Sequence, residues 1–272
     1  MPTELPLPAP VVVPLRHALA IQRRVIWALL MREVITRFGR RNLGVLWLLG
    51  EPMLFTVGVA ALWIAAGLHG GKGVNIVVFA ITGYSSVLVW RNTVSRCTHA
   101  IQQNFNLLYH RGVRVIDVLL TRVLLELGGA SGSFLVLSCI ALGGEWIEAP
   151  ADLARVLIGW AMLAWLALGL GLTVGALSGL SDLVERIWHP LAYLLFPLSG
   201  AAFLADWLPA AAREVIMYLP MVHGIEYIRS GWYGPVMHFH HDLGYMAVVN
   251  LALLLSGLWL TRYAAVRVGS GG

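Results

Sequence analysis

Charged residues are scarce in this sequence, and lysine is almost absent from it. Only 12% of the 272 residues are charged while 58% are hydrophobic, and Lys72 is the single lysine beside 18 arginines. A soluble globular domain carries roughly 25% charged residues, so half that share cannot cover a chain of this size with water-compatible groups. The composition argues against a soluble enzyme, a disordered chain and a DNA-binding domain, and it predicts an integral membrane protein.

Motifs for several kinds of chemistry are also missing. The two cysteines, Cys97 and Cys139, lie in or beside apolar segments and show neither a disulfide framework nor metal-ligand spacing. Residues 66–73 come nearest to a phosphate-binding loop, but they lack its first glycine and its closing Ser or Thr. The chain itself is therefore not expected to hydrolyse ATP.

Histidine and serine give only weak signals. His238, His240 and His241 cluster without a carboxylate or cysteine at useful spacing, so a solvated external cluster is favoured over a metal site. Other possible nucleophiles and bases are scattered over different elements: Ser85, Ser86, His99 and His189. The sequence predicts no catalytic residue, no metal ligand and no cofactor bound by this chain.

Six segments come near the roughly 20 mostly apolar residues that a membrane-spanning helix needs. They lie at 43–67, 74–90, 118–142, 153–177, 187–205 and 243–262. In the fourth, small residues recur every four positions and predict a face for close helix packing: Gly171, Gly175 and Gly179. The fold class expected is an all-α membrane protein with six transmembrane helices and both termini on one side.

The positions of the basic residues predict which side that is. Seven of the 19 basic residues precede the first predicted span, five lie between 91 and 122, one follows the fourth span and two follow the sixth; four lie on the opposite side. Basic residues collect on the cytoplasmic side of membrane proteins. Both termini are therefore expected in the cytoplasm, and the net charge of +5 does not indicate a nucleic-acid partner.

The two ends of the chain differ from the spans in composition. Residues 1–14 hold five of the twelve prolines, which predicts a disordered leader, and residues 269–272 predict a flexible tail. Residues 15–41 hold too many arginines to cross a bilayer but include the apolar run 25–31. They predict an amphipathic helix at the cytoplasmic interface; a merely solvated basic helix is the alternative.

Three connecting segments are predicted to have roles of their own. The cytoplasmic loops 91–117 and 178–186 are the places between spans where a cytoplasmic partner could act on the bundle. Outside, residues 206–235 predict two short helices with several interfacial aromatic residues. A re-entrant pair dipping into the outer leaflet is favoured there over a soluble loop.

Two acidic positions in the predicted spans have both a structural and a functional interpretation. Glu51, followed by Pro52, lies inside the first span, where a carboxylate is costly. Glu51 could pair with an interfacial arginine or could contact the substrate, and the sequence favours neither interpretation. Arg122 and Glu126 are four residues apart in the third span, and a structural ion pair is favoured over a substrate contact.

Two stretches of the sequence resemble a known family. Residues 31–55 contain Arg-Phe-Gly-Arg at 37–40, Leu-Gly-Val-Leu-Trp at 43–47 and Glu51-Pro52. This order resembles the signature of polysaccharide-exporting ABC transporter permeases. It is most similar to the capsular polysaccharide exporters of Gram-negative bacteria, since O-antigen and teichoic acid exporters usually lack the Glu before that Pro. Residues 223–234 are similar to the family's stretch before the last span.

The resemblance implies an inner-membrane permease subunit that forms a homodimer and works with two cytoplasmic ATPase subunits, which bind ATP and Mg. It implies that the loops 91–117 and 178–186 couple the two proteins, with these charged candidates: Arg111, Arg114, Asp182 and Glu185. The implied substrate is a long acidic glycan on a lipid anchor. A copolymerase-type adaptor and an outer-membrane export pore would receive it.

For such a substrate, the candidate contacts are arginines and aromatic rings. Arg37, Arg40 and Arg41 directly precede the first span, and the planar arginine fork binds phosphate or carboxylate through two hydrogen bonds. Aromatic rings can stack on sugar faces, although a lipid-facing aromatic belt is an equal alternative. The remaining candidates for the path are Glu51, Trp90, Arg122, Trp188, Tyr193, Trp207 and Trp232.

Two other functions stay open. One is an exporter of the same architecture that carries O-antigen, teichoic acid or a small lipophile. The other is a membrane-embedded transferase acting on lipid-linked sugars. That enzyme would need catalytic carboxylates at one membrane face, and the acidic residues inside the predicted spans are few and dispersed.

Overall fold

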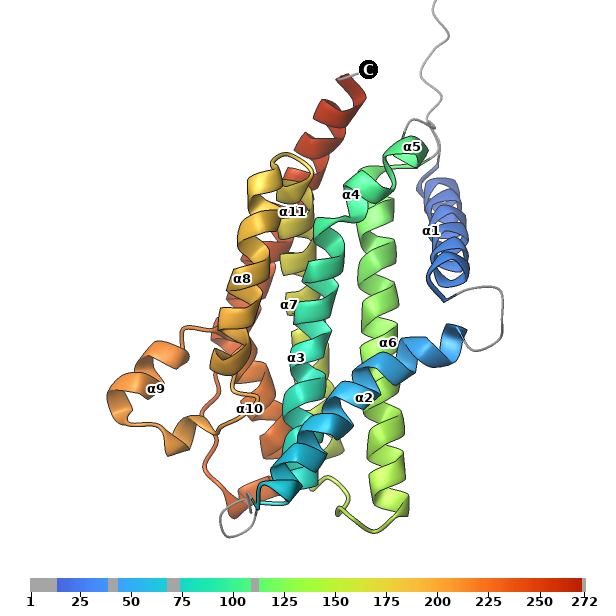
Figure 1. The fold of residues 1–272 in the computed structure, drawn as a ribbon. Helices are drawn as coiled ribbons and strands as arrows, with labels where there is room; N and C mark the ends of the chain where they lie inside the picture. The colour runs from blue at the N-terminus through green and yellow to red at the C-terminus, as the bar shows by residue number, and fades with distance from the viewer. Residues whose placement is uncertain (1–13, 39–43, 68–73, 109–112, 271–272) are drawn as a thin grey trace, which may run out of the picture.

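The computed structural model describes residues 14–38, 44–67, 74–108 and 113–270, and every regular element among these residues is a helix (Figure 1). The predicted all-helical class is confirmed. The long helices are α1 (Leu15–Phe38), α2 (Gly44–Ala65), α3 (Ile76–Thr98), α6 (Val115–Gly143), α7 (Leu153–Ser178), α8 (Asp182–Leu198), α10 (Pro220–Tyr233) and α11 (Leu243–Ser270). The short ones are α4 (Ala100–Gln103), α5 (Phe105–Leu108), α9 (Ala210–Ile216) and the 3₁₀ turns η1 (Ala205–Trp207) and η2 (Gly234–Val236).

Each predicted span overlaps one long helix, namely α2, α3, α6, α7, α8 or α11. Among the described residues, α2, α6, α7 and α11 are long and apolar enough to cross a membrane. The helix α8 has only 17 residues, and α3 is less apolar because it carries Arg91 and Arg96. Both helices also extend into the predicted cytoplasmic loops, since α3 continues past residue 90 to Thr98 and α8 begins at Asp182 rather than at residue 187.

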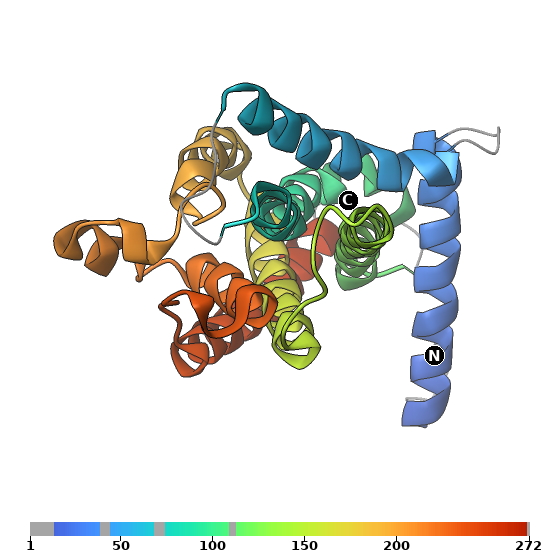
Figure 2. The ribbon, with the colours of Figure 1, turned by 90° about the horizontal axis from the view of Figure 1, so that it is seen from below.

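The helix α1 lies across the bundle and α2 crosses it obliquely, whereas α3, α6, α7, α8 and α11 run along it (Figures 1 and 2). Helix α1 packs against α6 and α2. The short helices α4 and α5 and the C-terminal end of α11 lie at one end of the bundle, here called the α4–α5 end; the connection from α6 to α7 lies at the opposite end (Figure 1). The last turn of α11 includes Gly269 and Ser270, two of the residues predicted as a tail. Most of the predicted leader, residues 1–13, lies outside the described residues.

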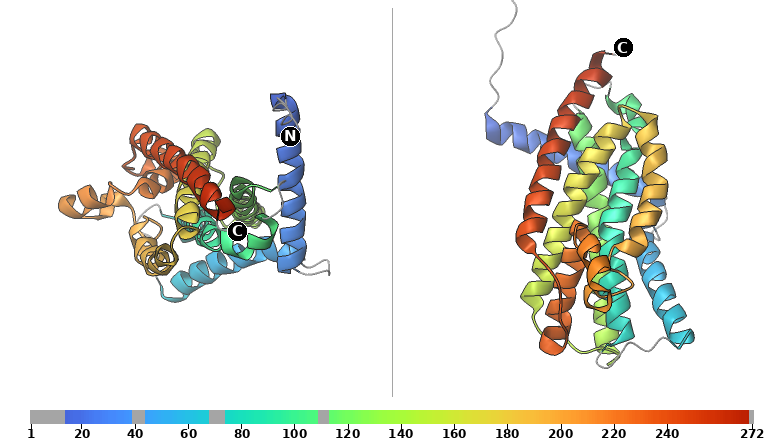
Figure 3. Two further views of the ribbon diagram at one scale, coloured as in Figure 1. Left: turned by 90° about the horizontal axis from the view of Figure 1, so that it is seen from above. Right: turned by 90° about the vertical axis from the view of Figure 1, so that its left-hand side faces the viewer.

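The helix α7 is the centre of the bundle and packs against α3, α6, α8, α10 and α11 (Figure 3). Its small residues allow this. A Cβ atom added to Gly175 would lie 2.7 Å from Cδ2 of Leu119 and 3.0 Å from the carbonyl oxygen of Cys97. Gly171 similarly faces Cys97, and Gly179 faces Ile101. With larger residues at these positions α7 could not approach α3, α4 and α6 so closely.

The segment between α8 and α11 contains the two short helices predicted at 206–235. The first, α9, has 7 residues and projects away from the bundle (Figure 2). The second, α10, has 14 residues and packs against α7, α3 and α11. At 1.5 Å per residue, α10 is roughly 21 Å long, too short to cross a bilayer.

Candidate functional site

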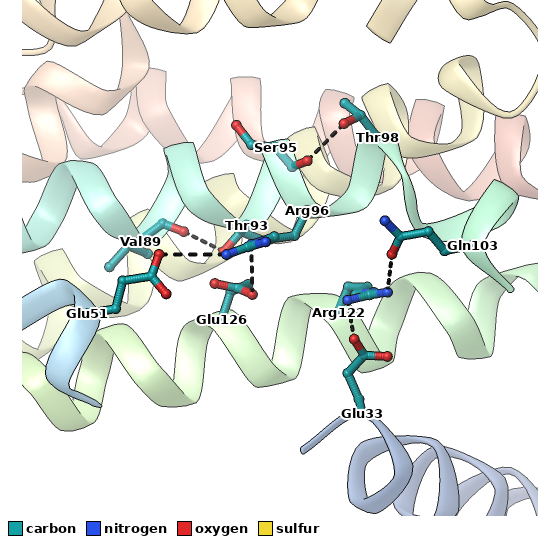
Figure 4. Close-up of polar contacts among 10 residues, drawn as sticks. All are labelled: Glu33, Glu51, Val89, Thr93, Ser95, Arg96, Thr98, Gln103, Arg122 and Glu126. Carbon is teal, nitrogen blue, oxygen red and sulfur yellow. Dashed lines mark hydrogen bonds and ion pairs between the residues drawn. The ribbon is translucent and has the colours of Figure 1, made fainter. Parts of the chain in front are cut away.

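A buried ion pair joins α1 to α6 (Figure 4). The guanidinium of Arg122 donates to the carboxylate of Glu33 and, at 2.7 Å, to Oε1 of Gln103 in α4. Only 5% of Arg122 and 8% of Glu33 is exposed. Buried charges cost several kcal/mol each unless they are paired, so this contact fixes where α1 crosses the bundle.

A second, more exposed group of charges joins α2, α3 and α6. Arg96 of α3 lies 3.6 Å from Glu51 and 3.7 Å from Glu126 (Figure 4). Glu51 therefore lies close to an arginine, as the first of its two interpretations, pairing with an arginine, requires. Arg122 and Glu126, for which an ion pair within one helix was the favoured interpretation, each contact a charged residue of another helix, Glu33 of α1 and Arg96 of α3.

Between these two groups lies an arginine-lined pocket of about 320 Å³. It is lined by Arg32, Glu33, Thr36, Arg96, His99, Gln103 and Arg122. Arginine can bind phosphate or carboxylate through two hydrogen bonds, although Arg122 already contacts Glu33 and Arg96 already contacts Glu51 and Glu126. Of the predicted substrate arginines, Arg122 lies in this arginine pocket. The side chain of Arg37, in the last turn of α1, lies outside the described part of the structure, as do Arg40 and Arg41.

The two predicted coupling segments contact each other. At the start of α8, Oδ1 of Asp182 accepts a hydrogen bond from Gln102 of α4 at 3.1 Å. One turn later, Glu185 lies 3.2 Å from Nδ1 of His99, which joins α3 to α4. Arg114 is exposed in the N-cap position of α6, while Arg111 lies outside the described residues. The α4–α5 end thus presents one combined surface rather than two separate loops.

Six aromatic side chains form a connected row over α2, α3, α8 and η1. The aromatic row consists of Phe55, Trp63, Phe79, Tyr84, Phe196 and Trp207. Ring centroids of Phe55, Tyr84 and Phe196 lie 5.6–6.0 Å from one another, and Trp63 lies 5.3 Å from Tyr84. At its α8 side the guanidinium of Arg91 lies 4.9 Å from the ring centroid of Tyr193 and 5.3 Å from that of Phe196.

The five aromatic residues predicted for a substrate path fall into two groups. Tyr193 and Trp207 are 68% and 51% exposed and lie beside or in the aromatic row. Trp90, Trp188 and Trp232 are buried in the apolar core. The indole N–H of Trp188 donates to Ser95 at 3.1 Å, and that of Trp232 donates to the Glu148 carbonyl at 3.1 Å. The row's members in α2 and α3 were not predicted, because apolar rings inside a span carry no sequence signal of their own.

Three polar residues of α10 anchor the segment around it, and sequence reasoning gave them no role. Arg229 is fully buried and donates to the carbonyls of Gly200, Ala201 and Phe203 at 2.6–2.7 Å. Glu226 accepts hydrogen bonds from the backbone N–H groups of Ala205 and His240, both at 3.1 Å. Buried backbone N–H and C=O groups need hydrogen-bond partners. Arg229 and Glu226 provide these partners for the non-helical segment before η1 and for the first residue of η1, which allows that segment to lie in the core.

His223 completes this set. Its Nδ1 accepts a hydrogen bond from the N–H of Asp242, and its Nε2 lies 2.8 Å from the carbonyl oxygen of Met217. A neutral ring with its proton on Nε2 satisfies both contacts. Burial lowers the pKa of His223, which favours this neutral form. The spacing of three and three residues from His223 to Glu226 to Arg229 was the available signal, because it puts all three on one side of a helix.

Comparison with known proteins identifies the family. The family described as ABC-2 type transporter matches residues 24–233. The chain is 42% identical over 247 residues to the capsule polysaccharide export inner-membrane protein BexB of Haemophilus influenzae, covering 91% of this chain and 93% of that protein. The chain belongs to the ABC-2 type transporters, among the capsule polysaccharide export inner-membrane proteins.

Two further relatives agree with this assignment. The capsule polysaccharide export inner-membrane protein CtrC of Neisseria meningitidis serogroup B is 43% identical over 242 residues, which cover 89% of this chain and 91% of the relative. The polysialic acid transport protein KpsM of Escherichia coli is 28% identical over 254 residues, which cover 91% of this chain and 96% of the relative. The resemblance noted in the sequence motifs is therefore confirmed.

Proposed function

We propose that this chain is the permease subunit of an ATP-driven exporter that moves a lipid-linked acidic polysaccharide across the bacterial inner membrane. The main support is the aromatic row. Its rings of Phe55 and Trp207 are partly exposed, while those of Phe79 and Tyr84 are buried and support them. The apolar faces of sugar rings can stack on the exposed rings without a fixed binding geometry. A long glycan needs such a surface, since it must move along every contact it makes.

The arginine pocket supports the acidic and lipid-linked character of the substrate. It lies beside α1 at the end of the bundle where arginines are concentrated. There a headgroup phosphate or a glycan carboxylate would meet Arg32, Arg96 and Arg122. Arg91, five residues before Arg96 on α3, lies about 7.5 Å further along the helix and contacts the ring of Phe196 in the aromatic row.

The proposed topology has six spans, formed by α2, α3, α6, α7, α8 and α11. The concentration of basic residues at the α4–α5 end supports its placement in the cytoplasm. Then α1, which crosses the bundle, would lie at the cytoplasmic interface, and α9 and α10 would enter the membrane from outside without spanning it. The polar residues of α3 and α8 would face protein or the passage rather than lipid.

Two copies of the chain and two ATPase subunits make up the proposed complex. The helices α2 and α8 flank the aromatic row and expose apolar side chains, among them Leu54, Leu62, Leu191 and Leu194. A second copy against these faces would enclose the two rows between the copies. The ATPase, with its ATP and Mg, would bind the surface formed by α4 and the start of α8, and a periplasmic adaptor and an outer-membrane pore would take over the glycan.

Deletion of the gene in its own host tests this proposal. We expect loss of surface polysaccharide and accumulation of a lipid-linked acidic glycan inside the cell, both reversed by the wild-type gene. If the chain were a transferase, the lipid-linked glycan would not form. If it exported O-antigen, teichoic acid or a small lipophile, chemical analysis of the accumulated material would identify that compound instead.

A further inference from the structure

Three side chains from two distant parts of the sequence come together at the α4–α5 end. They are His99, at the junction of α3 and α4, and Glu185 and His189 of α8, and one ligand atom of each lies within 4.8 Å of the others. Nδ1 of His99 is 3.2 Å from Oε1 of Glu185. The two imidazole rings are 5.6 Å apart and nearly parallel, with 30° between their planes.

We propose that these three residues form a binding site for a divalent transition-metal ion, with zinc as the best match. Two imidazole nitrogens and one carboxylate are a ligand set that zinc prefers, with water in the fourth position. Ligand atoms on a tetrahedral zinc ion are about 3.4 Å apart, from Zn–N distances of about 2.0–2.1 Å. The present separations therefore require only small side-chain rotations to close on an ion.

The helices around the site hold its ligands in register. Glu185 and His189 are four residues apart and so lie on one face of α8. Trp188, between them in sequence, donates to Ser95 of α3 at 3.1 Å and fixes α8 against α3 just before His99. The side chains of His99 and Glu185 are 34% and 25% exposed. An ion can therefore reach them from solvent, and their partial burial has already removed part of the water around the two side chains.

The charges around the site are mixed, because His99 also lines the arginine pocket and Arg186 directly follows Glu185. Asp182 lies one turn before Glu185 and is bound to Gln102 of α4, which adds a second carboxylate close to the site. The nearest arginine before His99 on α3, Arg96, lies close to the carboxylates of Glu51 and Glu126. The positive charge of that arginine is therefore offset by two acidic groups.

A bound ion would fasten the junction of α3 and α4 to the first turns of α8. These are the two segments on which coupling to the ATPase depends in the proposed function, so this consequence rests on that proposal, whereas metal binding itself does not. If the segments must move relative to each other during transport, zinc at this site would hold them together. We therefore expect that zinc bound at this site slows ATP-driven export.

Metal binding is tested with zinc itself on the purified complex of the chain with its ATPase, after chelation and removal of the chelator. Titration against a chromophoric zinc indicator should show one site per permease chain. His99→Gln, Glu185→Gln and His189→Gln should each weaken binding at least by the roughly 10- to 100-fold that loss of a second-shell partner costs. Cobalt in place of zinc should give the visible absorption of a tetrahedral nitrogen and oxygen site.

Two exposed histidines outside the site provide matched controls. His17→Gln in α1 and His238→Gln after η2 remove an exposed imidazole, as His189→Gln does, and should leave affinity unchanged. Equal zinc affinity in the wild type and in all three ligand variants would overturn the site, as would loss of binding in the control variants. For the coupling consequence, zinc should lower ATP hydrolysis in the wild-type complex and not in His189→Gln; an equal response in both would overturn that consequence alone.

Discussion

The ring of Trp207 stacks on the ring of Phe79, with centroids 5.4 Å apart and 16° between the planes. Trp207 belongs to η1 and Phe79 to the first turn of α3. The guanidinium of Arg229 also lies 3.7 Å from the centroid of the Phe79 ring, and it holds three carbonyls of the chain just before η1. The exposed end of the aromatic row is therefore positioned by α10, the helix that carries one of the two family motifs.

Alanine substitution should separate path residues from core residues among the aromatics. Tyr193→Ala and Trp207→Ala remove exposed rings, so we expect lower export with a normal yield of folded protein. Trp90→Ala and Trp188→Ala open cavities in the core and should cost about 3–5 kcal/mol of stability, which lowers the yield itself. Surface glycan per cell and the amount of monodisperse protein in detergent measure the two effects.

The matched control is Trp259→Ala. Trp259 is 66% exposed on α11, away from the helices that carry the aromatic row. A lipid-facing belt ring should be nearly silent in both assays. Normal export at normal yield for both the Tyr193 and the Trp207 variants would exclude this end of the row from the path.

Charge reversal at the α4–α5 end should uncouple ATP hydrolysis from export. Asp182→Lys removes the acceptor of Gln102, and Glu185→Lys removes the partner of His99, so α8 would no longer be tied to α4. Arg111→Glu and Arg114→Glu test the other side of the same predicted surface. We expect ATP hydrolysis to continue while export falls.

The control for charge reversal is Glu214→Lys in α9, an exposed acid at the far side of the fold. It should change neither ATP hydrolysis nor export. Normal export in all four variants at the α4–α5 end would show that the ATPase acts elsewhere on the chain.

The sequence was sufficient for the helices but not for their ends or their mutual contacts. Apolar runs reveal a buried segment, so each predicted span overlaps a helix. Polar residues near the end of α3 suggested a loop, yet Thr93 donates to the carbonyl of Val89 in its own helix and lets the helix continue. Such bonds within one helix satisfy polar side chains without ending the helix.

The site residues were harder to predict because their partners lie far away in the chain. Arg122 has a neighbour of opposite charge four residues on, but its buried partner is Glu33, 89 residues earlier. Trp90 and Tyr193 look alike in a sequence as aromatics near span ends. Only the packing of α3 in the middle of the bundle buries the first and leaves the second exposed.

The two groups of charges in Figure 4 should differ in their effect on stability. Arg122→Gln removes a buried cation from its contacts with Glu33 and Gln103 and should cost about 3–5 kcal/mol. Glu51→Gln should cost less than about 1 kcal/mol, because the side chains of Glu51 and Arg96 are 52% and 44% exposed and Arg96 also lies close to Glu126. Thermal unfolding in detergent measures both; equal losses for the two variants would contradict the difference in burial.

Acidification should loosen the segment that His223 anchors. Burial lowers the pKa of His223, so the folded state binds fewer protons there than the unfolded state, whose value is about 6.5. The stabilisation from His223 is therefore complete above that value and is lost as the pH falls through the lower folded pKa. We expect faster protease cleavage within 237–242 as the pH drops from about 7 to about 5.

The variant that tests this pH dependence is His223→Gln. The amide oxygen and nitrogen of Gln can take over the contacts to Asp242 and Met217 but do not titrate in this range. Cleavage of the Gln variant should depend less on pH than that of the wild type, while His238→Gln should behave like the wild type. If cleavage of His223→Gln kept the steep pH dependence of the wild type, the titrating residue would be His241 instead. Burial lowers the pKa of His241 as well.

Replacement of the arginines that precede α2 by lysine should impair export without changing topology. Arg37 belongs to the last turn of α1, and Arg40 and Arg41 follow it in the sequence before α2; in the proposed function, a lipid-anchored anion from the inner leaflet would meet these arginines. A planar guanidinium binds phosphate or carboxylate through two hydrogen bonds, and an ammonium group cannot. We expect the combined Arg37→Lys, Arg40→Lys and Arg41→Lys variant to insert correctly and to export poorly.

Lysine is the informative substitution here because it keeps the positive charge. General attraction to anionic lipid, about 1 kcal/mol per basic residue near the surface, and the charge bias that sets topology are both retained in the triple variant. Accessibility of single cysteines at the two termini checks its orientation, and surface glycan measures its export. A matched triple variant at Arg16, Arg23 and Arg24, in the first half of α1, should export normally. The triple-lysine variant at Arg37, Arg40 and Arg41 removes the planar guanidinium groups but keeps the positive charge. If it inserts correctly and exports like the wild type, these arginines act only in topology and in attraction to lipid headgroups.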